Sequence, residues 1–154
     1  MKPIHASLRR AGAMSLATII LAGPMWGTAT AVEVQDLKGF EPLFGRYAPA
    51  GDCGRQPQIV VDVDGFAFEV GGASERGDRP EFAASYGGNF YQGISQWFFP
   101  YRNAAGFPIL LTFNHGETPG VLAVEGHDAG WPGGPPLSAR DQVLVDGSPY
   151  AKCR

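Results

Sequence analysis

Two histidines and two glutamates stand in mirrored order in the stretch NHGETPGVLAVEGHD, residues 114–128. The triplet HGE at 115–117 opens the stretch, and the triplet EGH at 125–127 nearly closes it. Imidazole and carboxylate groups are common zinc ligands and common partners in acid–base catalysis. The first question is therefore whether these four side chains meet at one catalytic metal ion.

The strand pattern around the stretch separates the two histidines. Segments 107–114 and 121–127 flank the turn sequence ETPG, which predicts a hairpin in which residue 114 faces 121 and His127 lies opposite residue 108. About six strand residues, at about 3.3 Å each, then separate His115 from His127, whereas zinc ligands lie about 2 Å from the ion. We expect no shared metal site, and we expect neither a metal nor a cofactor.

Smaller sets of these groups still allow acid–base chemistry. An alternative function is therefore a small hydrolase that acts on cell-wall material through Glu125, His127 and Asp128. No serine stands in a GxSxG turn, and Cys53 and Cys153 are the only cysteines.

In an oxidising compartment such a pair of cysteines is typical of a disulfide, which here closes a loop of 100 residues (153 − 53).

Residues 1–31 have the features of a signal peptide. Lys2, Arg9 and Arg10 precede the apolar run AGAMSLATIILAG, and the small residues ATA at 29–31 follow as a cleavage site. The run is shorter than the roughly 20 apolar residues of a membrane-spanning helix, so we expect no membrane span in the mature chain. The arginine pair leaves twin-arginine export as an alternative to ordinary secretion, which we favour. The sequence thus predicts a periplasmic or secreted protein.

The mature chain has the length of one domain and an acidic balance. Cleavage after Ala31 leaves 123 residues (154 − 31), enough for a single disulfide-closed β domain over 32–154. That part carries 9 basic residues (12 − 3) and 15 acidic residues, a net charge of −6 with histidine neutral. Its basic residues form no cluster, which argues against nucleic acid as a partner.

Alternating apolar residues predict a mainly β domain, a compact antiparallel barrel or sandwich of about seven strands. We expect these strands at 43–47, 58–63, 66–70, 81–86, 90–99, 107–114 and 121–127. The dipeptide Asp64-Gly65 is typical of a tight hairpin turn and predicts that Val61 faces Phe68. Residues 32–41 are polar and are expected to be a loosely held lead-in.

One short C-terminal helix completes the predicted fold. Ser138 and Asp141 have the spacing of a helix N-terminal cap, and Gly147 stands where a helix would end. Ser148-Pro149 then predicts a second short turn that ends at Cys153.

The strand FYQGISQWFFPY, 90–101, has aromatic residues on both of its sides. Tyr91, Trp97 and Tyr101 share one parity and Phe98 has the other, so one side must face the core. The second side is either covered by the chain itself or exposed as a platform for a sugar or peptide, with Trp131 nearby. Tyr91, Trp97, Tyr101 and Trp131 are therefore the candidate binding residues for an envelope glycan or protein of unknown identity.

Several motifs of the mature chain resemble those of a known group of proteins. GRYAPAGDC (45–53), GFAFEV, QWFFP, HDAGWPGGPPLS and the ending GSPYAKC are similar to a family of short exported bacterial proteins of uncharacterised function. The resemblance implies a bacterial envelope setting and transfers no site residue. A looser likeness, in a G-x-[YW] strand followed by a bridged cysteine, is to small periplasmic β-barrels, including lysozyme inhibitors, whose SGxxY segment is absent here.

Three functions follow as hypotheses. The first is a non-enzymatic exported (periplasmic) binding or inhibitory module of unknown ligand, acting through the aromatic strand and its neighbouring loops. The alternatives are the small cell-wall hydrolase and a structural envelope protein without ligand. A hydrolase needs titratable groups that converge in a cleft, whereas a binding module needs an exposed apolar patch.

Overall fold

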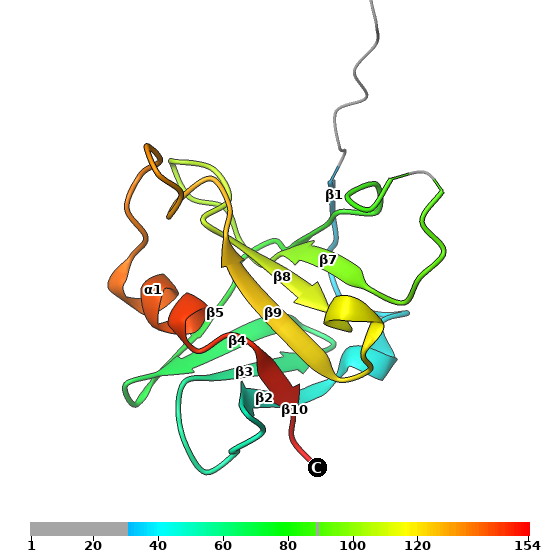
Figure 1. The fold of residues 1–154 in the computed structure, drawn as a ribbon, viewed down its shortest axis with the longest axis horizontal. Helices are drawn as coiled ribbons and strands as arrows, with labels where there is room; N and C mark the ends of the chain where they lie inside the picture. The colour runs from blue at the N-terminus through cyan, green and yellow to red at the C-terminus, as the bar shows by residue number, and fades with distance from the viewer. Residues whose placement is uncertain (1–30, 89) are drawn as a thin grey trace, which may run out of the picture.

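This computed structural model describes residues 31–88 and 90–154, where short strands with alternating apolar residues are the main regular elements (Figure 1). The strands are β1 (Val32–Glu33), β2 (Gly45–Pro49), β3 (Gln58–Asp62), β4 (Gly65–Val70), β5 (Ala73–Arg76), β6 (Glu81–Phe82), β7 (Gln96–Phe99), β8 (Ile109–Phe113), β9 (Val121–Gly126) and β10 (Tyr150–Lys152). The helices are the 3-10 turns η1 (Glu41–Leu43) and η2 (His115–Glu117) and the α-helix α1 (Ala139–Asp146). Apart from Ala31, the predicted signal peptide, 1–31, lies outside the described residues.

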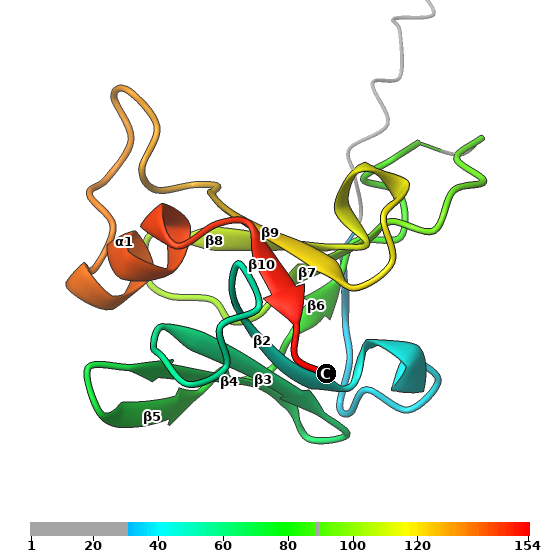
Figure 2. The same cartoon turned by 60° about the horizontal axis from the view of Figure 1, so that its bottom comes forward.

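All ten strands belong to one antiparallel sheet that curls into a half-barrel. Their order is β1-β6-β7-β8-β9-β10-β2-β3-β4-β5. Figure 2 shows β8 and β9 above the layer formed by β2 to β5, with β10 running between them. The three-residue strand β10 pairs with β9 on one side and with β2 on the other, so it joins the two parts of the sheet.

The mainly β fold is confirmed, but the expected number of about seven strands is wrong. The strands β1, β5 and β10 are the additional ones, and each has only two to four residues, too few to show a period. Residues 32–41 are not a loose lead-in, because Leu37 is fully buried and its backbone N–H donates to Val63 O at 2.8 Å. The segment after Pro149 is strand β10 rather than a turn.

The two predicted hairpins illustrate how far local patterns specify register. In the β8–β9 hairpin Leu110 faces Glu125, which is the predicted register, and His127 N–H donates to Pro108 O at 2.9 Å. In the β3–β4 hairpin Val61 faces Phe66 instead of Phe68, a slip of two residues. A two-residue slip keeps every side chain on its predicted face, so the alternation alone did not distinguish the two registers.

Helix α1 has the predicted bounds and caps. Ser138 Oγ accepts the backbone N–H of Asp141 at 3.1 Å, and the helix ends before Gly147. Leu144 is fully buried, and the Tyr150 hydroxyl donates to Leu144 O at 2.8 Å. The helix is thereby fixed at one end of the half-barrel (Figure 2).

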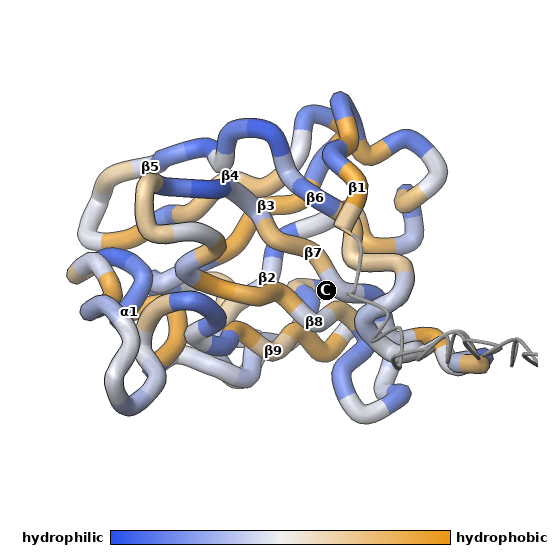
Figure 3. The backbone as a smooth tube through the Cα atoms, turned by 90° about the horizontal axis from the view of Figure 1, so that it is seen from above, coloured by the Kyte–Doolittle hydropathy of each residue, from blue (hydrophilic) through white to orange (hydrophobic). Residues whose placement is uncertain are grey.

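The core fills the concave side of the sheet. Phe66, Phe98 and Phe113 meet there with ring centroids 5.3 to 5.8 Å apart, and each of the three is fully buried. Figure 3 shows hydrophobic residues along central strands such as β3 and β9, whereas the edge strand β5 is mostly hydrophilic. Each fully buried phenylalanine contributes about 2 kcal/mol or more to folding by leaving water.

The Cys53–Cys153 disulfide that the cysteine count predicts is present, with the two Cα atoms 5.9 Å apart. It holds the residue after β10 against the loop that follows β2. Over residues 31–88 and 90–154, no helix has the length and apolar character needed to cross a membrane.

Candidate functional site

The convex side of β7 carries a second, smaller apolar cluster. Trp97 and Phe99 alternate with the core residue Phe98, so they point away from the concave side. Around them lies the outer aromatic cluster, which we define as Tyr86, Tyr91, Trp97, Phe99, Phe107 and His127. Ring centroids within it are 4.9 Å apart for Tyr91 and Trp97, 5.9 Å for Tyr86 and Trp97, and 4.3 Å for Phe99 and Phe107.

The segment before β7, residues 83–88 and 90–95, leads up to this cluster and is called the Phe90 loop here. Phe90 is 95 % exposed, and Tyr86, Tyr91 and Ile94 are also exposed. The sequence from 82 to 101 contains no Asp, Glu, Lys or Arg, although 18 % of all residues are charged. An uncharged loop with several exposed apolar side chains, supported by packed rings, is typical of an interaction surface.

A single carboxylate fixes the end of the Phe90 loop to the turn between β8 and β9. Glu117 Oε2 accepts the backbone N–H of Ile94 at 2.7 Å, and Glu117 Oε1 accepts hydrogen bonds from the Tyr91 hydroxyl and from Ser95 Oγ, the latter at 3.0 Å. The hydrogen bond from Tyr91 is the largest cause that lowers the pKa of Glu117. The Tyr91 hydroxyl in turn accepts the backbone N–H of Ser95 at 2.6 Å. This network orients the Tyr91 ring against Trp97.

Tyr101 lies in a different environment from Tyr91 and Trp97. Pro100 follows the last residue of β7, so side chains beyond it no longer alternate between the two faces of the sheet. The Tyr101 hydroxyl donates to Asp141, and the guanidinium carbon of Arg140 lies 4.7 Å from the Tyr101 ring centroid. Burial is the main cause that raises the pKa of Tyr101. The residue therefore connects the end of β7 to helix α1.

Trp131, the fourth candidate, is 55 % exposed and lies against its own loop. A Cβ atom added at Gly134 would lie 2.3 Å from Trp131 Nε1, so the indole covers the backbone there. Of the four residues selected from the sequence, the structure thus brings Tyr91 and Trp97 together and places Tyr101 and Trp131 elsewhere. Sequence reasoning did not select Tyr86 and Phe90, although the uncharged run 82–101 was visible.

The mirrored histidines lie at opposite ends of the β8–β9 hairpin. His115 begins η2 at the turn, whereas His127 follows β9 and packs its ring against Phe99 with centroids 4.7 Å apart. His127 Nδ1 lies 3.1 Å from Asp128 Oδ1, and Asp128 Oδ2 accepts the backbone N–H of Phe107 at 2.7 Å. Through these contacts, His127 and Asp128 hold the end of β9 against Phe99 and Phe107.

Glu125, the remaining member of the predicted acid–base set, is exposed on β9 and faces Leu110. Within residues 31–88 and 90–154, no three His, Cys, Asp or Glu side chains are grouped closely enough to hold a metal ion.

These observations define the class of structure, which is an antiparallel half-barrel with an aromatic cluster on its convex side. No protein-family model, curated protein or solved structure matches this chain. The resemblance to short exported bacterial proteins therefore stays a prediction.

Proposed function

We propose that this protein is a non-enzymatic, exported binding or inhibitory module that acts in the periplasm or outside the cell. The observation that carries the proposal is the almost complete exposure of Phe90 in a loop without charged residues. Exposing a phenylalanine to water is unfavourable by about 2 kcal/mol relative to burying it, so binding a partner over this side chain would be favoured. The disulfide supports the exported setting, because such bonds persist in oxidising compartments.

The partner class is an envelope glycan or an envelope protein. Aromatic rings stack on the apolar faces of sugars and on apolar side chains alike, and the Phe90 loop offers both rings and backbone groups. Because Glu117 fixes Tyr91 and Ile94, much of the surface is ordered before a ligand arrives, which lowers the entropic cost of binding.

Tryptophan fluorescence tests the proposal directly. Trp97 and Trp131 are the only tryptophans after residue 31, so a Trp131→Phe variant leaves Trp97 as the single reporter in the mature chain. We expect soluble peptidoglycan fragments or a c-type lysozyme to change this fluorescence saturably. Phe90→Ser should then weaken binding by about ten-fold, because it removes an exposed aromatic anchor.

Val143→Ser is the matched control for Phe90→Ser. Val143 is an exposed apolar residue on α1, remote in the fold from the Phe90 loop, and its replacement should leave the affinity unchanged. Equal losses in the two variants, or no response to either probe, would contradict the assignment of the Phe90 loop as the binding surface.

A further inference from the structure

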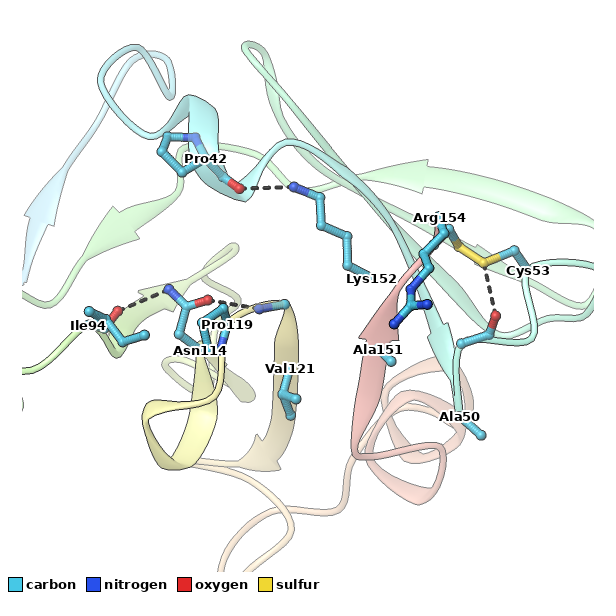
Figure 4. Close-up of a pocket in the computed structure, with 13 residues that line it drawn as sticks. Pro42, Ala50, Cys53, Ile94, Asn114, Pro119, Val121, Ala151, Lys152 and Arg154 are labelled. Carbon is cyan, nitrogen blue, oxygen red and sulfur yellow. Dashed lines mark hydrogen bonds between the residues drawn. A yellow bond between two sulfur atoms is a disulfide. The ribbon is translucent and has the colours of Figure 1, made fainter.

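A groove of about 940 Å³ lies beside the Cys53–Cys153 disulfide and is called the bridge groove here (Figure 4). The turn between β8 and β9 forms one side of it, with Asn114, Pro119 and Gly120 among its lining residues. Residues 151–154, at and after the end of β10, form the other side. Its volume is near the upper end of the range for small-molecule pockets, and its open form suits an extended chain.

Two unpaired cations line this groove. Nine basic residues follow residue 31, and six of them form ion pairs with carboxylates within the described part of the chain. The three without such a pair there are Arg102, Lys152 and Arg154, and the last two both line the bridge groove. Of the three cations that lack a carboxylate partner over residues 31–88 and 90–154, two thus lie at one site.

The ammonium group of Lys152 is held in place while retaining free donors. Lys152 Nζ donates to Pro42 O at 2.9 Å and lies 6.0 Å from the Tyr47 ring centroid. One of its three N–H groups is used by that hydrogen bond, which leaves two donors for further hydrogen bonds. Figure 4 shows this contact on the rim of the groove.

No carboxylate side chain lines the bridge groove. The carboxylates near lining residues have other partners. Asp52 pairs with Arg55 at 3.8 Å, and Glu41 Oε1 accepts the backbone N–H of Gly39 at 2.9 Å. Glu117 accepts the backbone N–H of the lining residue Ile94 at 2.7 Å and Ser95 Oγ at 3.0 Å. Lys152 and Arg154 are therefore the only charged side chains of the lining, and they favour an anionic ligand.

The uncharged part of the lining favours a peptide over a sugar. Most of it consists of small or apolar residues, such as Pro119, Val121 and Ala151. Its one side-chain amide, Asn114, already uses Nδ2 on Ile94 O at 3.0 Å and Oδ1 on the backbone N–H of Gly120 at 3.1 Å. A hydroxyl-rich sugar would find few side-chain partners there, whereas an extended peptide brings apolar side chains that fit this lining.

We propose that the bridge groove binds an extended acidic peptide segment of a protein partner, whose carboxylates pair with Lys152 and Arg154. This goes beyond the function proposed for the Phe90 loop, because it assigns a second surface and a ligand charge. Ile94 belongs to the loop and also lines the groove, so the two surfaces adjoin.

Fluorescence anisotropy with a labelled peptide of alternating Glu and Ala tests the proposal on the mature protein. The matched peptide of alternating Gln and Ala should bind about ten-fold more weakly. The Lys152→Gln/Arg154→Gln variant should bind the acidic peptide about ten-fold more weakly than the wild type, and Arg102→Gln should bind it within about two-fold of the wild type. Backbone amide shifts at Gly120 and Ala151 on titration would locate the peptide in the groove.

Three results would overturn the proposal. One is equal affinity for the Glu and Gln peptides, and another is an equal loss in Arg102→Gln and in the double variant. The third is tighter binding of polygalacturonate than of the acidic peptide, which would assign the groove to an anionic glycan. Phe90→Ser should keep its affinity for the acidic peptide, so failure of the Phe90 loop as a binding surface is distinguished from failure of the groove. Far-ultraviolet circular dichroism of each variant checks that it is folded.

Discussion

Replacing both cysteines by alanine should remove a large part of the stability of this fold. The disulfide closes a loop with a sequence separation of 100, for which the chain-entropy relation gives about 4.7 kcal/mol of stabilisation. Domains of this size are stable by about 5 to 15 kcal/mol, so the loss would range from roughly 30 % of the total to nearly all of it. The effect arises mainly in the unfolded chain, which gains freedom once the bridge is absent.

The fold also determines where the loss should be felt first. Strand β10 alone joins β9 to β2, and Cys153 N–H donates to Arg46 O at 2.7 Å directly beyond it. Without the bridge, the short β10 depends on its hydrogen bonds and on the buried Tyr150 ring. Amide exchange at Lys152, whose N–H donates to Gly120 O at 2.8 Å, should therefore accelerate more than exchange in β8.

Guanidinium denaturation of the wild type and of the Cys53→Ala/Cys153→Ala variant measures the loss. The wild type unfolded under reducing conditions is the control, and it should coincide with the variant because both lack the bridge. A difference in unfolding free energy below about 1 kcal/mol, with the same dependence on denaturant, would refute the reasoning.

Three further predictions concern the core, the loop and the tyrosines. Phe98→Ala should destabilise by about 3 to 5 kcal/mol in chemical denaturation, because Phe98 is fully buried, whereas Phe90→Ala should change stability by less than about 0.5 kcal/mol. The pKa of Glu117 is lowered in the folded protein, so the stability that this carboxylate contributes is present above its unfolded pKa and is lost as pH falls through its folded pKa. Trp97 fluorescence in Trp131→Phe should show this acid transition, and adding Glu117→Gln should abolish it. Burial raises the pKa of Tyr47 to about 12 from 10.0. The stability that the neutral Tyr47 side chain contributes is therefore complete below pH 10.0 and disappears as pH rises to about 12. Ultraviolet absorbance should show this tyrosine ionising together with unfolding, and ionisation without unfolding would contradict the assignment.

Part of the candidate surface could be predicted from the sequence. The alternation in β7 placed Trp97 opposite to Phe98, and the structure has them on opposite sides of the sheet. The same parity failed for Tyr101, because Pro100 ends the strand and the chain changes direction there. Tyr91 lies in a loop, and its position beside Trp97 depends on Glu117, a residue 26 positions further along the chain. No local pattern reports such a contact.

The sequence by itself determined the local features of this protein. Ser138 and Gly147 marked the ends of α1, the turn sequence ETPG specified the register of the β8–β9 hairpin, and two cysteines indicated the disulfide. These features depend on residues within a few positions of each other, or on a pairing with one possible solution. The tertiary structure alone decided that β10 joins the two parts of the sheet and that Lys152 and Arg154 line a groove together with the turn between β8 and β9. The physical reason is that strands of two to four residues carry no readable period, and their stability comes from neighbours that are distant in the chain.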